Sequence, residues 1–336
     1  MPVTDIGIDL GTATIIVYVK GRGVLYQEPS IAAYDRDANK ILAFGTEAEQ
    51  IIGRTPGNIV GIRPLKNGVI SDFVVTERML RHFIRKSMGF RNILKPRICI
   101  CVPSGVTDIE KRAVEEASYR AGARDAVIVR EPVVAAMGAG VDIMKPCGTL
   151  VVNIGGGVTE IAVVSLGGIV VSQTLKVAGE SFNEAIRNYV STKYDLFIGE
   201  QMAQEIKISL CSVSNEMAGD SKLQKIEVRG RKNDSGVPAS VTLTAEQAAE
   251  AVAPPIRQIV DAVHGVIEKT PPDLAGDIAE RGIVLTGGGA MIAGMENAVT
   301  RETGIRAILA ENPQQAVAIG TGGYIQALSE FEKRRF

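Results

Sequence analysis

Two segments far apart in the chain repeat one pattern, and this repeat constrains the fold more than any other feature. DIGIDLGTATIIVYV begins at residue 5, and LVVNIGGGVTEIAVV begins at residue 150. In each segment an apolar strand leads through a glycine-containing turn into a second apolar strand, which is the pattern of a β-hairpin. A duplicated unit in a chain of 336 residues predicts an α/β protein with two related domains and a cleft between them.

The aligned turns also predict the chemistry of that cleft. At an offset of 144 residues, Asp9-Leu10-Gly11 falls on Asn153-Ile154-Gly155. Glycine lets the backbone approach an anion closely, and two such turns facing each other could grip a phosphate chain from both sides. A carboxylate at the end of a first strand, such as Asp9, suits Mg²⁺, which prefers oxygen ligands and keeps its waters. A third run, TGGGAMIAGM from residue 286, leads into a helix, whose N-terminus favours anions.

Other functional classes fit the sequence poorly. The chain has 37 basic and 38 acidic residues, so its charge gives no reason to expect nucleic acid as a partner. A dinucleotide fold needs its glycines between a strand and a helix, whereas the first two turns here join strand to strand. No G-x-x-x-x-G-K-[ST] P-loop occurs. The four cysteines include no C-x-x-C pair and no apolar run is long enough to span a membrane, so we expect a cytoplasmic protein.

Local signals predict several helix boundaries. Thr107-x-x-Glu110 and Ser181-x-x-Glu184 have the spacing of capping boxes, which predicts helices over 108–121 and 182–194. The helical pattern over 245–269 contains Pro254-Pro255. A proline pair removes two backbone donors, so we expect it to kink this helix or to divide it in two.

The glycine motifs, taken together, resemble those of a known family. The DLGT hairpin, the IGGG hairpin and the TGGG turn are similar to the phosphate-1, phosphate-2 and adenosine motifs of the superfamily of actin, sugar kinases and heat-shock chaperone ATPases. Within it, the chain resembles the MreB family of bacterial actins over almost its whole length. The supporting stretches are EPSIAAYD (28–35), GRTPGNIVGIRPLKNGVISDF (53–73), VPSG (102–105), EPVVAA (131–136), KTPPDLAGDIAERGIVLTGGG (269–289) and AVAIGTG (316–322).

The resemblance implies an actin-like fold of the duplicated ribonuclease H type, with four subdomains around a nucleotide cleft. Domain I would comprise residues 1–145 and 315–336, with a small subdomain at about 33–65. Domain II would comprise residues 146–314, with a small subdomain at about 182–245. ATP or ADP with Mg²⁺ would occupy the cleft.

Site residues carry over by position from the same resemblance. Asp9 would bind Mg²⁺, and Asn153 would contact the ion through a water molecule. Glu131 would orient the attacking water or act as general base, and Thr159 is the second catalytic candidate. The residues implied for nucleotide binding are Gly11, Thr12, Ala13, Thr14, Gly155, Gly156, Gly157, Gln204, Lys207, Gly287, Gly288, Gly289 and Ala290.

The second phosphate motif departs from the family. It reads NIGGGVTE at residues 153–160, where the family usually has DIGGGTTE, so Asn153 replaces a carboxylate and Val158 a hydroxyl. Gln204 stands where a glutamate is usual, and Glu180 and Asn183 replace the two aspartates of a G-D-x-x-D pattern. Two hypotheses follow: the protein binds nucleotide but hydrolyses it slowly and serves mainly as a scaffold, or it is an ordinary slow ATPase whose hydrolysis times filament turnover.

The resemblance also implies partners. MreB proteins form filaments, typically antiparallel pairs on the inner face of the cell membrane, where they guide cell-wall synthesis and rod shape together with other shape proteins. Ile93 and Leu94, flanked by Arg91 and Lys95, form the candidate membrane contact, because basic neighbours favour anionic headgroups. The alternative is that this apolar pair packs back on its own domain. We therefore expect a cytoplasmic protein that is peripheral on the inner membrane face.

Overall fold

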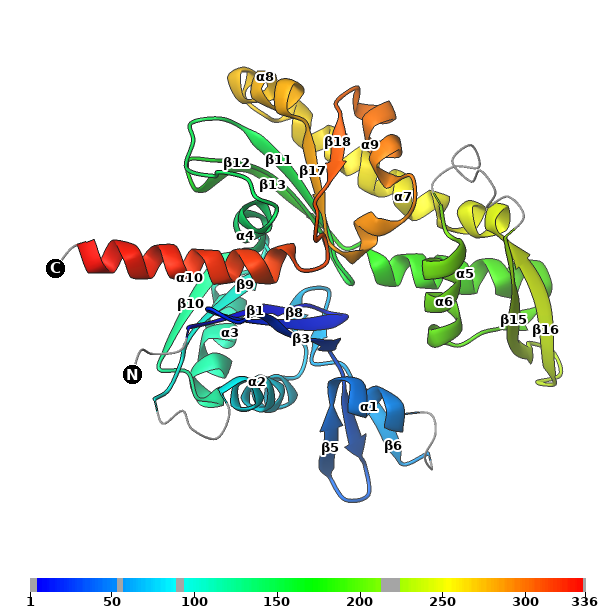
Figure 1. The fold of residues 1–336 in the computed structure, drawn as a ribbon. Helices are drawn as coiled ribbons and strands as arrows, with labels where there is room; N and C mark the ends of the chain where they lie inside the picture. Colours follow the sequence, from blue (N-terminus) through cyan, green and yellow to red (C-terminus); the bar gives the residue numbers. More distant parts are fainter. Residues whose placement is uncertain (1–4, 53–56, 89–93, 213–223, 335–336) are drawn as a thin grey trace.

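The fold contains two five-stranded sheets with the same topology, which confirms the predicted duplication. The computed structural model describes residues 5–52, 57–88, 94–212 and 224–334. Each sheet begins with an antiparallel three-stranded meander and continues with two parallel strands (Figure 1). The first sheet has the order β10-β9-β1-β2-β3. It consists of β1 (Asp5–Leu10), β2 (Thr14–Val19), β3 (Gly23–Pro29), β9 (Arg97–Val102) and β10 (Asp125–Arg130).

The second sheet repeats this arrangement in the order β13-β12-β11-β17-β18. Its strands β11 and β12 are buried along almost their whole length, as expected of a sheet covered on both faces. The sheet consists of β11 (Thr149–Ile154), β12 (Thr159–Ser165), β13 (Gly168–Leu175), β17 (Ile283–Thr286) and β18 (Ala307–Leu309).

Two helices, α4 (Glu131–Gly138) and α10 (Ala316–Arg334), lie between the sheets (Figure 1). Helix α10 packs on β1 and β9, and α4 packs on β11 and β12. Glycines let the two helices cross closely, since a Cβ on Gly138 would lie 1.7 Å from the carbonyl oxygen of Ala316. A Cβ on Gly320 would likewise lie 1.8 Å from the carbonyl oxygen of Val134. This crossing joins the two halves of the molecule.

The outer faces of both sheets are covered by amphipathic helices. Helices α2 (Phe73–Met88) and α3 (Asp108–Ala121) pack on the first sheet through a core that includes Phe83 and Met79. Helices α7 (Ala245–Glu268) and α8 (Pro272–Arg281) pack on the second sheet, and α9 (Met295–Thr303) packs beside α7.

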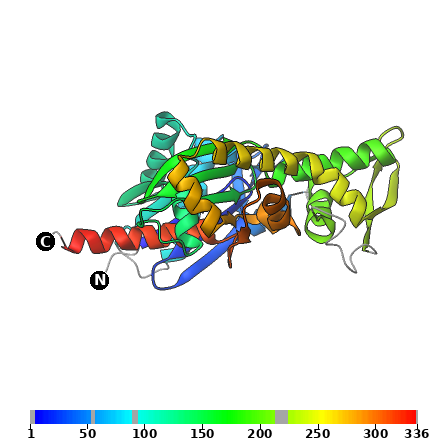
Figure 2. The same cartoon turned by 90° about the horizontal axis from the view of Figure 1, so that it is seen from above.

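Two smaller units extend from the sheets. The first contains β4 (Ala32–Asp35), β5 (Lys40–Phe44), α1 (Gly45–Ile51) and β6 (Ile59–Ile62), and the short hairpin of β7 (Leu65–Lys66) and β8 (Val69–Ile70) follows it. The second contains α5 (Gly179–Tyr194), β14 (Leu196–Phe197), α6 (Glu200–Leu210), β15 (Lys225–Lys232) and β16 (Pro238–Thr244). Figure 2 shows β15 and β16 at the end of the molecule opposite both termini. The exact domain boundaries stay a prediction.

One local prediction is confirmed, one needs correction, and for the proline pair the predicted division is wrong whereas the predicted kink stays a prediction. The capping box at Thr107 and Glu110 is present and opens α3. Helix α5 instead begins at Gly179, and the hydroxyl of Ser181 accepts from the backbone N–H of Ala178 (3.3 Å) within its first turn. Helix α7 is not divided at Pro254-Pro255, because a long buried face that includes Val252 and Ile259 anchors both of its halves.

Candidate functional site: a cleft between two glycine turns

The two repeated glycine turns have the same geometry and face each other. Each is closed by the same backbone bond: the N–H of Gly11 donates to Thr14 (3.0 Å), and that of Gly155 donates to Val158 (3.0 Å). A Cβ on Gly156 would lie 2.5 Å from the Cβ of Ala13. The structure therefore brings the first turn against the second, and glycine is required for this close approach.

The turns carry hydrogen-bond donors that the protein does not use. Among the described residues, no protein acceptor binds the backbone N–H groups of Thr12, Ala13, Gly156 and Gly157. The hydroxyl oxygen of Thr12 accepts from the N–H of Gly68 (3.0 Å), which leaves the hydroxyl hydrogen available. Backbone N–H groups converging from two glycine turns suit the oxygens of a phosphate chain.

Asp9 is the penultimate residue of strand β1 and lies beside these turns. Burial raises the pKa of its carboxyl to about 7, opposed by a hydrogen bond from the Cys101 thiol, whose Sγ lies 3.8 Å from Oδ1. Within the described ranges, no basic side chain forms an ion pair with Asp9. A carboxylate that is buried without a cationic partner is costly, and binding a cation would remove that cost.

Glu131 opens α4 and is held by the second hairpin. Its carboxylate accepts a hydrogen bond from Nδ2 of Asn153, and Oδ1 of Asn153 accepts from the hydroxyl of Thr286 (3.0 Å). Burial raises the pKa of Glu131 well above its usual range, and the carboxylates of Glu160 and Asp9 raise it further. The hydrogen bond from Asn153 acts in the opposite direction.

Glu160, two strand positions beyond the second turn, completes the acidic group. It is fully buried and accepts from both the backbone N–H of Ser104 (2.8 Å) and the Ser104 hydroxyl. Burial raises its pKa, and its Oε1 has no hydrogen-bond partner among the described residues. Ser104 follows β9 of the first sheet, so this contact joins the two halves of the chain.

These carboxylates fit a magnesium ion that keeps its own waters. Among the described residues no basic side chain pairs with Asp9 or Glu131, and Glu160 leaves one oxygen unpaired. A cation bound in the cleft would therefore favour the ionised form of these carboxyls, whose pKa values burial raises. In the part of the chain that the structure describes, however, no three acidic, His or Cys side chains are arranged to hold a metal directly. Mg²⁺ commonly binds through one carboxylate, waters and substrate phosphates, which is the mode that this arrangement suits.

The third glycine turn packs on the end of β11. Gly287 has a φ of +85°, and a Cβ there would lie 2.3 Å from the carbonyl oxygen of Ile154 and 2.7 Å from Oδ1 of Asn153. A Cβ on Gly289 would lie 2.4 Å from the Ile154 side chain. The turn continues into the 3-10 helix η2 (Gly288–Met291), in which Ala290 is buried. The predicted phosphate and nucleoside motifs of the second half are therefore in contact.

The two candidates on α6 contact α5 next to the second turn. Nζ of Lys207 donates to the carbonyl oxygen of Gly179 (2.9 Å), and burial lowers the pKa of Lys207 to about 8. Oε1 of Gln204 accepts from Nδ2 of Asn183 (3.0 Å), whereas Oδ1 of Asn183 is buried without a partner among the described residues. An acceptor left unpaired at this place suits a hydroxyl or amino group of a ligand.

A cavity of about 350 Å³ opens between the two smaller units. Thr12 and Asn183 line it, together with Lys66 and with the ion pair between Nη2 of Arg63 and Oε1 of Glu200 (2.6 Å). The sequence reasoning did not find this ion pair, because its partners are 137 positions apart and Glu200 lies outside every quoted motif.

Two other predicted residues lie elsewhere. The Thr159 hydroxyl donates to the carbonyl oxygen of Val177 (2.7 Å) and is fully buried, so its proton is already used within the second sheet. Ile93 lies outside the described residues, and Leu94 is 45% exposed. None of the helices in the described ranges combines the length and apolar character needed to cross a membrane.

The fold and the facing glycine turns define the class of protein. The structure is similar to that of MreB5 of Spiroplasma citri bound to AMPPNP, with a TM-score of 0.93, 33% identity and 100% of each chain covered. It also has the fold of the MamK double helical filament, with a TM-score of 0.81 at 20% identity over 97% of this chain and 99% of that one. The chain is therefore an actin-like protein, as the sequence predicts.

Sequence comparisons define the family within this class. The family model described as MreB/Mbl protein matches residues 3–333. The chain is 45% identical to the cell shape-determining protein Mbl of Bacillus subtilis over 331 residues, 98% of each chain. It is also 45% identical to the cell shape-determining protein MreB of Escherichia coli strain K12, over 96% of this chain and 94% of that one. The chain belongs to the MreB/Mbl family.

Proposed function

We propose that this protein is a nucleotide-dependent cytoskeletal protein that forms filaments and helps to determine cell shape. The family relatives Mbl and MreB are named for cell-shape determination, and MreB5 has been crystallised with AMPPNP and with ADP. The observation that carries the proposal is the pair of facing turns with unused N–H groups, beside carboxylates that fit a hydrated Mg²⁺.

The proposal is tested by binding and assembly together. We expect a fluorescent ATP analogue to bind in the presence of Mg²⁺, and filaments to sediment and to be visible by electron microscopy when ATP is added. Gly157→Ala should weaken both, because a Cβ there would lie 2.6 Å from the Thr12 hydroxyl oxygen. A protein that binds neither ATP nor ADP at millimolar concentration would contradict the proposal.

The reaction proposed for the cleft is slow hydrolysis of ATP. Glu131 would accept the proton of the attacking water, the backbone N–H groups of both turns would hold the phosphates, and Mg²⁺ would neutralise their charge. An amide at position 153 supplies no negative charge to the waters of the ion. Loss of one such interaction costs about 1–3 kcal/mol, or about ten- to a hundredfold in rate.

The proposed weakening of hydrolysis is tested by measuring phosphate release. The native chain is compared with Asn153→Asp and with Asn153→Asp/Val158→Thr. Faster turnover in the variants is expected, and equal turnover would favour the second candidate, an ordinary slow ATPase. In that case hydrolysis times filament turnover, and filaments should live longer with a non-hydrolysable analogue than with ATP. Asn153 is the specific residue that favours the first candidate.

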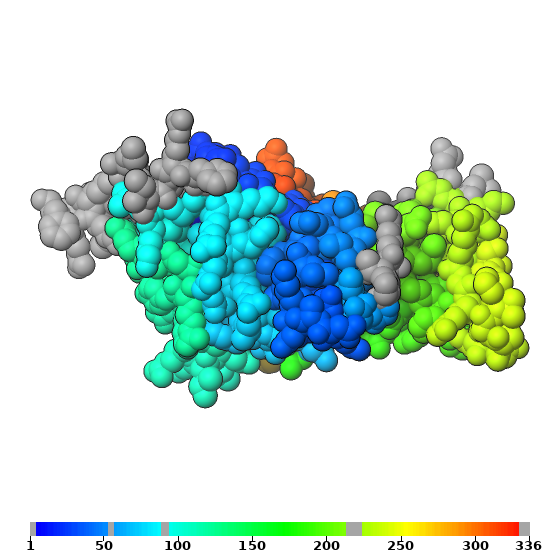
Figure 3. All heavy atoms as spheres, turned by 90° about the horizontal axis from the view of Figure 1, so that it is seen from below, coloured from blue at the N-terminus to red at the C-terminus, as the bar shows by residue number. Residues whose placement is uncertain are grey.

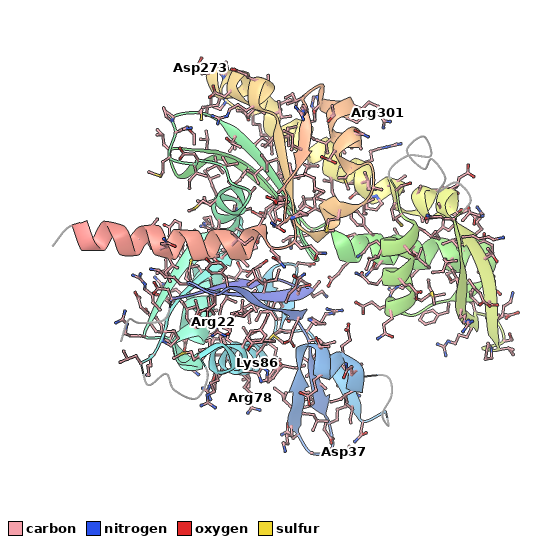
Figure 4. The ribbon with its side chains drawn as sticks, viewed as in Figure 1. Arg22, Asp37, Arg78, Lys86, Asp273 and Arg301 are labelled. Carbon is pink, nitrogen blue, oxygen red and sulfur yellow. The ribbon has the colours of Figure 1, made fainter. Side chains whose placement is uncertain are left out.

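Membrane association is proposed for the surface next to α2. Leu94 is exposed, and the last turn of α2 carries Arg85 and Lys86. Arg22 donates to the carbonyl oxygen of Ser87 (3.0 Å), which brings another basic side chain to this end of the helix. Figure 4 shows Arg22 and Lys86 near one another. Figure 3, from below, shows α2 at the surface beside the unit that contains β5.

Sedimentation with liposomes tests this surface. We expect binding to anionic vesicles, and weaker binding after Ile93→Ser/Leu94→Ser. Ile109→Ser is the matched control, since Ile109 is 80% exposed on α3. Equal binding by the double variant would exclude this contact. In the cell, we propose that the protein is peripheral on the inner membrane face and forms antiparallel double filaments. Its proposed partners are shape proteins and cell-wall synthesis proteins.

A further inference from the structure

The side chain of Asn153 links both halves of the candidate site. It lies at the end of β11, in register with Glu160 on β12 and Thr286 on β17, and is 4% exposed. Its Oδ1 accepts from the Thr286 hydroxyl, and its Nδ2 donates to Glu131. Glu131 belongs to the connection that follows the first sheet, whereas Thr286 begins the third glycine turn. The amide therefore ties the candidate base to that turn.

An amide makes this link, and a carboxylate would break it. Asparagine has both a donor and an acceptor, whereas an ionised aspartate has acceptors alone. An aspartate at this position could still accept from Thr286, but once Glu131 is ionised, as a base for hydrolysis must be, the two carboxylates would repel each other. The contact with Glu131 thus changes from repulsion to a hydrogen bond when the residue is asparagine.

Nothing else in the described structure competes for the Glu131 carboxylate. Asn153 is its one hydrogen-bond partner among the described residues, and no basic side chain there pairs with it. The other charged groups that act on it, Glu160 and Asp9, repel it. The position of the carboxylate is therefore decided by the amide, which Thr286 in turn anchors.

We propose that Asn153 is a positioning residue that restrains Glu131 against β11 and so limits its use as the base for hydrolysis. In that reaction the water oxygen bonds to the γ-phosphorus while the bond from that phosphorus to the bridging oxygen breaks. ADP leaves with the electron pair, and the proton of the water passes to Glu131. This inference rests on the proposed ATP site, and it differs from simple loss of charge at Mg²⁺ because releasing the restraint needs no new charge.

The test is phosphate release in a single turnover by Asn153→Ala, Thr286→Val and Glu131→Gln. If Asn153 restrains Glu131, Asn153→Ala releases phosphate about three- to tenfold faster than the native chain, although it adds no carboxylate. Thr286→Val releases phosphate faster by a smaller factor. The gain disappears in Asn153→Ala/Glu131→Gln, which a purely structural role would not produce. Thr270→Val removes a buried hydroxyl elsewhere and leaves the rate unchanged.

Other outcomes overturn the inference. It fails if Asn153→Ala is no faster than the native chain, or if the gain persists when Glu131 is replaced. Affinity for a fluorescent ADP analogue and the melting temperature are measured for every variant, and if Asn153→Ala does not fold, Thr286→Val decides alone. Absence of nucleotide binding in the native chain would refute the proposed function, whereas binding without faster turnover in the variants refutes the restraint only.

Discussion

Asp9→Asn should make the nucleotide-free protein more stable above neutral pH. Burial raises the pKa of Asp9 from 3.8 to about 7. Between these values the folded protein holds a proton that the unfolded chain has released, so the free energy of unfolding falls as the pH rises. The loss begins near pH 4, is complete near pH 7 and stays constant above it. Asparagine has the same shape and carries no such penalty.

The magnitude follows from the same values. A difference of about 3 pH units at about 1.4 kcal/mol each sets a limit of about 4 kcal/mol. Asp9 is only partly buried at the cleft, so solvent screens some of this, and we expect the variant to gain about 2–3 kcal/mol at pH 8. At pH 4 the gain should be close to zero. Above pH 7, the carboxylate that is proposed to hold Mg²⁺ therefore destabilises the nucleotide-free fold.

Urea unfolding without nucleotide, from pH 4 to pH 8, measures the effect. Asp261→Asn is the control, because Asp261 is exposed on α7. When Mg²⁺ and ADP are added, we expect them to stabilise the native chain more than they stabilise Asp9→Asn. The variant lacks the carboxylate proposed to hold Mg²⁺, and a ligand stabilises a protein only to the extent that it binds the folded form. Equal stability of Asp9→Asn and the native chain at pH 8, or a gain that persists at pH 4, would refute the argument.

Three further predictions concern the cleft. The ion pair between Arg63 and Glu200 bridges the two sides of the cleft. Arg63→Ala should therefore release a fluorescent nucleotide about two- to fivefold faster than the native chain. The exchanged pair Arg63→Glu/Glu200→Arg should restore slow release. Lys207 loses its charge as the pH rises through about 8, so nucleotide affinity should fall between pH 7 and 9 in titrations of the native chain and stay level in Lys207→Met. Gly157→Ala should lower affinity at least about tenfold in the same titration, whereas Gly276→Ala, which meets no neighbour within 4 Å, should not.

The parts of the site that depend on local backbone could be predicted from the sequence. The spacing of the repeat places Gly11 and Gly155 at equivalent positions, and both turns close with the same backbone bond. The duplication of the domains follows from the same repeat, whereas the parallel pairing of the later strands with each meander is seen only in the structure. The need for glycine at position 156 becomes clear only from the structure. A side chain on Gly156 would meet atoms of Ala13, which belongs to the first turn.

Contacts between distant side chains could not be predicted. Thr286 lies 133 positions from Asn153 in the sequence, and Glu131 lies 22 positions from it. Neither spacing follows the period of a helix or a strand. The sequence therefore identifies Asn153 as an unusual residue, and its contact with Mg²⁺ through water stays a prediction, whereas its two protein partners are found only in the structure. The start of α5 was misjudged for a related reason, because its first turn packs on Gly155 and Gly156.

The acidic group explains why binding and closure of the cleft should be coupled. Asp9 and Glu131 come from the first half of the chain and Glu160 from the second, so bringing the halves together gathers buried carboxylates that repel one another. That repulsion opposes closure until a cation compensates it. The proposed nucleotide with Mg²⁺ would supply this charge and would also bridge the facing turns, so it would stabilise this arrangement by its binding free energy. The amide of Asn153 adds no further charge to this group, and its hydrogen bond to Glu131 would, under the proposed restraint, hold the carboxylate that hydrolysis needs.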